Sequence, residues 1–131
     1  MTDPLKSLLI VDDDTVYRQR LAMAMEKRGF AVRQAESVAA GIAAAKSEAP
    51  HYAVVDLRLT DGSGLDIVTE IRHVNPDCRV IILTGYGNIA TAVSAIKHGA
   101  ADYLPKPADA DQVEAALLDH KAALPPPPEQ P

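Results

Sequence analysis

Short apolar runs alternate with longer amphipathic segments along this chain, and that alternation limits the possible folds more than any other feature. Runs of four apolar residues occur at 8–11, 52–55 and 80–83, and weaker ones lie at 31–33 and 102–104. Four-residue runs rich in Val and Ile are typical of strands buried on both faces, as in parallel sheets. The weak run at 31–33 predicts an edge strand.

The segments between these runs show helical spacing. Ile89, Ala92, Val93 and Ile96 fall at i, i+3, i+4 and i+7, which places them in one apolar stripe on one helix face. Two other segments repeat the pattern, the first less cleanly: 17, 21, 24, 25 and 28, and then 113, 116, 117 and 120.

Residues that begin and end helices stand where this pattern requires them. We expect Asp14 and Ser37 to cap the first two helices, and Asp109 to form a capping-box-like pair with Gln112. Gly29 and Gly99 follow the first and fourth helical segments, as C-terminal glycines do.

Strand and helix thus alternate five times between about residues 8 and 123, which predicts an α/β fold with a parallel sheet and right-handed crossovers. Such open sheets bind ligands outside the carboxyl ends of their strands, where the strand order reverses. Functional residues are therefore expected at that edge.

Length and charge exclude several classes of protein. The 131 residues fit one compact domain, and a net charge of −5 disfavours nucleic-acid binding by this domain. Since the chain shows neither a signal peptide nor a run of about 18 apolar residues, we expect a cytoplasmic protein without a membrane segment. Cys78 is the single cysteine, which excludes an internal disulfide.

Polar side chains gather at the ends of the predicted strands. They are two acids after the first strand, one after the third, a hydroxyl after the fourth and a lysine after the fifth: Asp12, Asp13, Asp56, Thr84 and Lys106. Carboxylates about 4 Å apart repel by roughly 4 kcal/mol at an effective dielectric of 20, so the group requires protons or a cation. Mg²⁺ suits it, because this ion accepts one or two carboxylates plus phosphate oxygens.

Such a site can form an aspartyl phosphate. Asp56 is the expected nucleophile because it stands alone at a strand end, and the Arg58 carbonyl can serve as a further metal ligand. Lys106 can meet a carboxylate or a phosphoryl oxygen. Each residue alone also has an ordinary explanation, such as a helix cap for Asp12 and Asp13 or a turn for Lys106.

Several spaced motifs resemble the receiver domain of two-component response regulators, over about residues 5 to 123. They are LLIVDDD at 8–14, VVDLRL at 54–59, DG at 61–62, LTG at 83–85 and KP at 106–107. The segments 83–93 and 106–111 are similar to the RegA/PrrA/ActR group of redox-responsive regulators.

This resemblance implies a flavodoxin-like, doubly wound sheet of strand order 2-1-3-4-5 with five helices. It also implies phosphoryl transfer to Asp56 from a sensor histidine kinase, with Asp12 and Asp13 as the acidic pair beside Mg²⁺. Thr84 matches the switch hydroxyl, Lys106 the phosphate-contacting lysine and Tyr103 the switch aromatic. Pro105 departs from the expected small residue and removes a backbone donor.

Residues 5–123 are thus expected to form the receiver domain, and residues 124–131 a proline-rich linker or a frayed tail. Members of this group carry a helix-turn-helix domain after such a linker. The resemblance therefore implies DNA binding and transcriptional control only through a C-terminal domain absent here, together with dimerisation on phosphorylation.

Other functions remain open from the residues. A small Mg²⁺-dependent phosphatase also uses an Asp nucleophile, but that interpretation leaves Asp56 and Thr84 unexplained. An interaction module with a degenerate acidic pocket disagrees with the complete set of site residues, and a flavin protein would need a phosphate loop after the first strand. Cys78 is expected to be structural, with no role in redox sensing, and the histidines lack metal-ligand spacing.

Overall fold

A computed structural model describes residues 6–85 and 89–118. Within them, a five-stranded parallel sheet has the order β2-β1-β3-β6-β7, which is the predicted order 2-1-3-4-5 when the sheet strands alone are counted. Its strands are β1 (Lys6–Val11), β2 (Phe30–Ala35), β3 (Tyr52–Asp56), β6 (Arg79–Thr84) and β7 (Asp102–Pro105). The fold class and the edge position of the weak second strand are confirmed.

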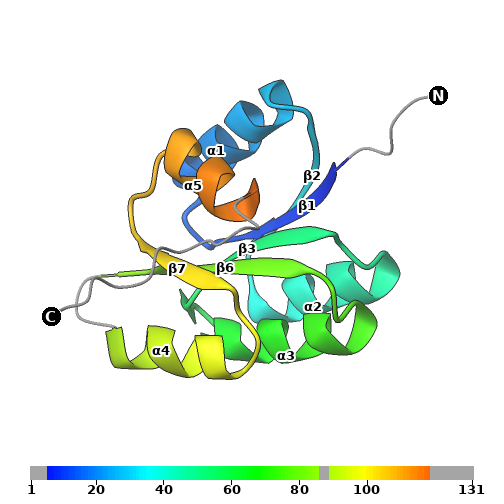
Figure 1. Ribbon diagram of the computed structural model, residues 1–131, viewed down its shortest axis with the longest axis vertical. Coiled ribbons are helices and arrows are strands. Elements are labelled where there is room, and N and C mark those ends of the chain that lie inside the picture. Colours follow the sequence, from blue (N-terminus) through cyan, green and yellow to red (C-terminus); the bar gives the residue numbers. More distant parts are fainter. Residues whose placement is uncertain (1–5, 86–88, 119–131) are drawn as a thin grey trace, which may run out of the picture.

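The described residues include five helices, of which the first four lie between strands and the fifth follows β7 (Figure 1). They are α1 (Thr15–Lys27), α2 (Val38–Ser47), α3 (Gly64–Val74), α4 (Ile89–Lys97) and α5 (Ala110–Leu118). The predicted linker at 124–131, His120 and the ends of the predicted domain lie outside the described residues.

Alternate strand residues face the two helical layers, because successive side chains in a strand point to opposite faces. Leu8 and Ile10 join a buried cluster with residues of α1 and α5. Leu9 and Val11 join another with residues of α2, α3 and α4. Figure 1 shows α1 and α5 on one face of the sheet and the other three helices on the opposite face.

The predicted helix signals act as expected. The Asp14 side chain accepts from the Tyr17 amide at 3.1 Å, and Ser37 accepts from the Ala40 amide at 3.0 Å. Asp109 and Gln112 exchange hydrogen bonds of 2.8 and 3.0 Å as a capping box. The backbone φ angles of Gly29 (96°) and Gly99 (122°) are positive, which favours glycine.

The α4 stripe is only partly buried. Ala92 is buried, but Ile89, Val93 and Ile96 are 54%, 44% and 38% exposed. Ala95 takes the second buried position, so α4 turns its alanines to the core and its larger apolar residues outward.

The chain after β3 forms a small hairpin that the sequence analysis did not predict. Strands β4 (Arg58–Leu59) and β5 (Gly62–Ser63) pair antiparallel, with Thr60 and Asp61 between them. Two-residue strands are too short to show periodicity, so no sequence pattern indicates them.

Candidate phosphoacceptor site

Three carboxylates meet at the carboxyl edge of the sheet. Asp12 follows β1 and is fully buried, Asp13 is exposed, and Asp56 ends β3 with 6% of its surface exposed. One oxygen from each of the three lies within 4.8 Å of the others. The structure thus brings together the three acids that the sequence analysis singled out.

Lys106 bridges two of these acids. Its Nζ lies 2.9 Å from Asp12 Oδ2 and 3.2 Å from Asp56 Oδ2. The Lys106 amide donates to the Thr84 carbonyl at 2.9 Å, which ties the residue after β7 to the end of β6. The Lys106–Pro107 peptide bond is cis.

Burial and charge set the protonation of this group. Burial, and then the Asp12 carboxylate, raise the pKa of Asp56, while Lys106 and the Arg58 amide oppose the rise. Burial by itself would lower the pKa of Lys106. Its bonds and attraction to Asp12 and Asp56 outweigh burial, so the pKa is raised.

The donor set fits a hard divalent cation. The three carboxylates and the one ammonium together carry two negative charges. Every side-chain atom in this group that could bind the ion is a carboxylate oxygen. The buried Asp12 Oδ2 is within ion-pair distance of Lys106 but accepts no hydrogen bond of good geometry from the described residues. Such an atom is suited to be a metal ligand.

The remaining predicted residues lie at the end of β6, on β7 and just after β3. Thr84 is buried at the end of β6, and its hydroxyl donates to the Gly85 carbonyl at 3.2 Å. Tyr103 on β7 is half-buried and packs against the cluster beneath α2, α3 and α4. The Arg58 amide donates to Asp56 Oδ1 at 3.3 Å. The switch roles of Thr84 and Tyr103 and the metal role of the Arg58 carbonyl stay predictions.

Two side chains that hold Asp12 and Asp13 in place were not predicted from the sequence. The Arg18 guanidinium is buried, and its Nη1 donates to the Asp12 carbonyl at 2.8 Å while its Nε donates to Gln34 at 3.0 Å. Arg18 begins the i, i+3, i+4, i+7 set of buried α1 residues, so its spacing gave a usable signal. Thr60 donates to Asp13 Oδ2 at 2.7 Å, and no sequence pattern indicates that contact.

The Lys106 loop is also anchored to α1. The Tyr17 hydroxyl donates to the Ala108 carbonyl at 2.7 Å, and the Lys106 Nζ lies 5.4 Å from the centre of the Tyr17 ring. Burial raises the pKa of the Tyr17 phenol, so it stays protonated as a donor. The half-buried tyrosine on α1 therefore helps to fix the lysine.

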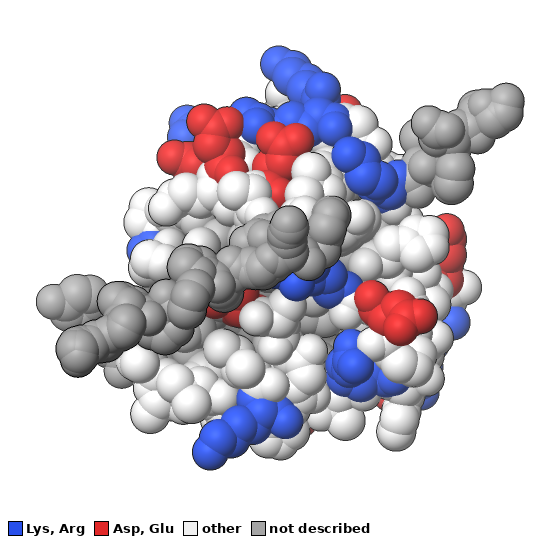
Figure 2. Space-filling model, viewed as in Figure 1, with Lys and Arg blue, Asp and Glu red and all other residues white. Residues whose placement is uncertain are grey.

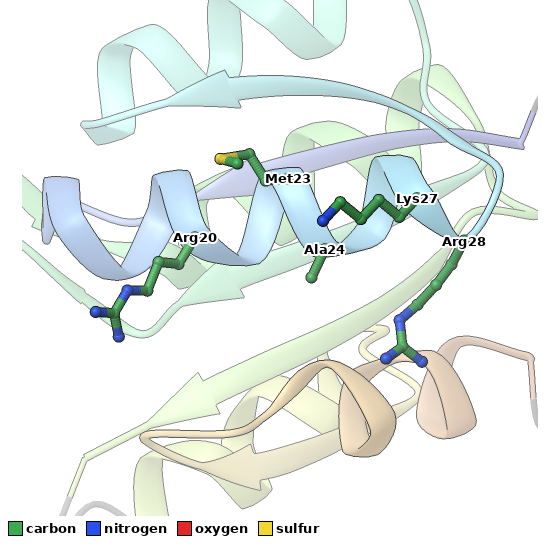
Figure 3. Close-up of a pocket in the computed structure, with 5 residues that line it drawn as sticks. All are labelled: Arg20, Met23, Ala24, Lys27 and Arg28. Carbon is green, nitrogen blue, oxygen red and sulfur yellow. The ribbon is translucent and has the colours of Figure 1, made fainter.

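Two surface hollows differ in their position relative to the carboxyl edge of the sheet, where the three acids lie. One borders it and is lined by Asp13, Glu36, Ser37, Thr60 and Asp61. The other lies over α1 and is lined by Arg20, Met23, Ala24, Lys27 and Arg28 (Figure 3). The α1 hollow contains no residue of the acidic group.

Arg28 at the second hollow belongs to a surface ion-pair network. Its guanidinium points toward α5 and lies 2.9 Å from Asp111 and 2.8 Å from Glu114 (Figure 3). Figure 2 shows basic and acidic side chains close together at the top of the view, over α1 and α5. These pairs join the two helices on one face of the sheet.

Comparisons with known proteins agree with the fold and with the geometry of the site. The family model of the response regulator receiver domain matches residues 8–118. The photosynthetic apparatus regulatory protein RegA of Rhodovulum sulfidophilum is 63% identical over 125 residues, covering 95% of this chain and 68% of that protein. The acid tolerance regulatory protein ActR of Rhizobium meliloti is 63% identical over 128 residues, covering 98% of this chain and 66% of that protein.

A solved structure of a response regulator protein is also similar to this chain. The crystal structure of a response regulator protein from Burkholderia pseudomallei, with a phosphorylated aspartic acid, calcium ion and citrate, has a TM-score of 0.81 and 43% identity. The match covers 86% of this chain and 66% of that one. Among residues 6–85 and 89–118, no helix has the length and apolar character needed to cross a membrane.

These relatives are regulatory proteins and give no support to the phosphatase alternative. The chain spans about two thirds of the length of the two curated relatives. Receiver domains bind Mg²⁺ at an aspartate cluster of the kind formed by Asp12, Asp13 and Asp56. The chain belongs to the response regulator receiver domain family.

Proposed function

We propose that Asp56 accepts a phosphoryl group from a histidine of a sensor kinase and that phosphorylation switches this domain between two conformations. The observation that carries the proposal is the meeting of three carboxylates at one edge of the sheet, with the Lys106 Nζ 2.9 and 3.2 Å from two of them. In addition, the Burkholderia relative is described with a phosphorylated aspartic acid.

The transfer needs a positioned nucleophile and compensation of charge. A carboxylate oxygen of Asp56 attacks phosphorus, the phosphorus–nitrogen bond breaks, and the kinase imidazole leaves with the bonding electrons. The raised pKa of Asp56 marks a carboxylate that is poorly solvated. Lys106, already in contact with Asp56, supplies positive charge to the phosphoryl oxygens.

Asp12, Asp13, Asp56 and the Arg58 carbonyl would hold Mg²⁺ in this site. When bound, the ion supplies charge neutralisation at the carboxylates and at the phosphoryl oxygens. The residues of the chain carry out the other tasks: Asp12 is fixed by burial and Asp56 by its β3 position.

Thr84 and Tyr103 are the proposed switch. The phosphoryl group offers a new acceptor to the Thr84 hydroxyl, and the inward movement of Thr84 makes space for the Tyr103 ring. The face formed by α4, β7 and α5 then changes shape. A few kcal/mol separate such states, so one charged contact can shift their populations.

Residues 5–123 act in this proposal as the receiver domain of a longer cytoplasmic transcription regulator, and residues 124–131 as its linker. The relatives' names support regulation, and their greater length leaves room for a helix-turn-helix domain that binds DNA. Phosphorylation would favour a homodimer. Self-phosphorylation from small donors and autodephosphorylation are the only reactions proposed for the chain itself.

Mass spectrometry tests the phosphoacceptor. After incubation with acetyl phosphate and Mg²⁺, the parent chain is expected to gain one phosphoryl group and Asp56→Asn none. Asp77→Asn, an exposed change in the loop before β6, is the matched control and should gain one. Labelling of Asp56→Asn, or continued turnover of small phosphate esters, would contradict the proposal.

Dimerisation tests the switch. Beryllofluoride with Mg²⁺ is expected to raise the sedimentation coefficient of the parent chain, and Thr84→Ala and Tyr103→Ala should each weaken that response. If both variants respond as the parent does, these two residues do not couple the site to the surface.

A further inference from the structure

The three acids of the site are held in different ways. Asp12 is fully buried, its Oδ1 accepts from the Asp14 amide at 2.9 Å, and Lys106 contacts it. Asp56 is held by Lys106 and by the Arg58 amide. Asp13 is exposed, and among the described residues its side chain is held by the hydrogen bond from Thr60.

The backbone around Thr60 is itself fixed at several points. Arg58 pairs with Ser63 and Leu59 with Gly62 on either side of the Thr60–Asp61 turn. Both oxygens of the Asp61 carboxylate accept from α2, at 2.7 Å from the Val38 amide and 3.1 Å from the Ala39 amide. The turn is therefore anchored to the first turn of α2, and Thr60 presents its hydroxyl from a fixed support.

The Thr60 bond leaves Asp13 able to bind a metal. An ionised carboxylate has about four lone-pair positions, and the hydroxyl donates to one of them, on Oδ2. Fixing an exposed side chain in one conformation costs conformational entropy. A carboxylate that is already oriented therefore loses less entropy when it binds a cation.

We propose that Thr60 is a positioning residue for the divalent cation: its hydroxyl, presented by the β4–β5 turn, orients Asp13 toward Asp12 and Asp56. The inference rests on the proposed function, because it takes these three acids as the Mg²⁺ ligands. It adds a residue from the β4–β5 turn that acts through Asp13.

Isothermal titration with MgCl₂ tests this role in two variants of the whole chain. Thr60→Val keeps the shape of the side chain without the hydroxyl, and Thr60→Ser keeps the hydroxyl. We expect Thr60→Val to bind Mg²⁺ about tenfold more weakly, at the low end of such effects because both side chains are exposed. Thr60→Ser should keep an affinity close to that of the parent chain.

Thermal unfolding with and without Mg²⁺ separates positioning from a purely structural role. A positioning residue reduces the rise in Tm that Mg²⁺ produces, since that rise follows the affinity of the folded state. A structural residue lowers the metal-free Tm and leaves the Mg²⁺-dependent rise unchanged.

The inference is overturned if Thr60→Val binds Mg²⁺ as tightly as the parent chain or more tightly, or if Thr60→Ser is as weak as Thr60→Val. A parent chain that does not bind Mg²⁺ would instead refute the metal site of the proposed function, so the two failures are distinguishable.

Discussion

Helices α3 and α4 have similar amphipathic sequences but are packed in opposite ways. In α3, Ile67, Val68 and Ile71 are fully buried against the sheet. In α4 the buried residues are Ala92 and Ala95, and the larger apolar residues face outward. Figure 2 shows the surface over α4, at the lower left of the view, as largely uncharged.

The neighbours of each helix explain the difference. α3 packs beside α2 closely enough that a Cβ at Gly41 would lie 2.8 Å from Ile67 Cδ1. α4 lies next to β6 and the edge strand β7, and it contacts them through small alanine side chains. Since less apolar area holds α4 in place, moving it costs less free energy than moving α3. That is the side where the proposed switch acts.

Thiol reactivity should show the largest contrast between the two helices. Burial raises the pKa of Cys78, which packs with α3 residues, to about 12, although Arg72 opposes the rise. At about pH 8, a new thiol from Val93→Cys on α4 should react with iodoacetamide on the order of a thousandfold faster than Cys78. Mass spectrometry of a time course measures both rates, and the parent chain in urea controls for access. Equal rates would mean that the α3 side opens as readily as α4.

Truncation of matched isoleucines should show the next largest contrast. Ile71→Ala removes a fully buried side chain and should lower the free energy of unfolding by about 2–5 kcal/mol. Ile96→Ala, on the exposed face of α4, should cost less than about 1 kcal/mol. Urea titrations measure both losses. Comparable losses would show that α4 is packed more tightly than its exposure indicates.

The smallest effect is expected where the β4–β5 turn is bound to the first turn of α2. Hydrogen bonds from the Val38 and Ala39 amides lower the pKa of the Asp61 carboxyl. Because the pKa is lower in the folded state, the ionised group stabilises the fold above the ordinary carboxyl pKa of about 4. This contribution disappears as the pH falls through the lowered value. Asp61→Asn should therefore be less stable than the parent chain near neutral pH and approach it in acid.

The control for this pH dependence is Asp77→Asn, which makes the same change of charge on the surface outside the α2 contact. Thermal unfolding across the acid range should show a gap for Asp61→Asn that closes in acid, and no such gap for the control. A gap that stays constant with pH would assign the loss to shape and not to the charged cap.

The sequence predicted the fold well because its signals are local. Four-residue apolar runs, caps such as Asp14 and terminal glycines such as Gly29 each act on their own segment. The exposure of Ile89, Val93 and Ile96 could not be predicted, because a stripe shows that a helix is amphipathic but its neighbours decide which residues are covered.

The candidate site divides in the same way. Asp12, Asp56 and Lys106 could be predicted to meet because they stand at or directly after the carboxyl ends of parallel strands, and these ends share one edge. The contact between Thr60 and Asp13, 47 residues apart in sequence, depends on the path of a loop that no periodicity describes. The spacing of Arg18 could have predicted that it lies on the buried face of α1. Because it is charged, and charged residues are seldom buried, it was not assigned to the core.

Pro105 affects how the sheet can associate. Alternate amides of β7 face opposite sides, and the Lys106 amide faces β6, where it donates to Thr84. The donor that Pro105 lacks is therefore one that would face away from the sheet, so the ring costs no bond to β6. An incoming strand from another chain would find a gap in the ladder at this position. If copies of the domain associate beside β7, side chains rather than a continued sheet would have to join them.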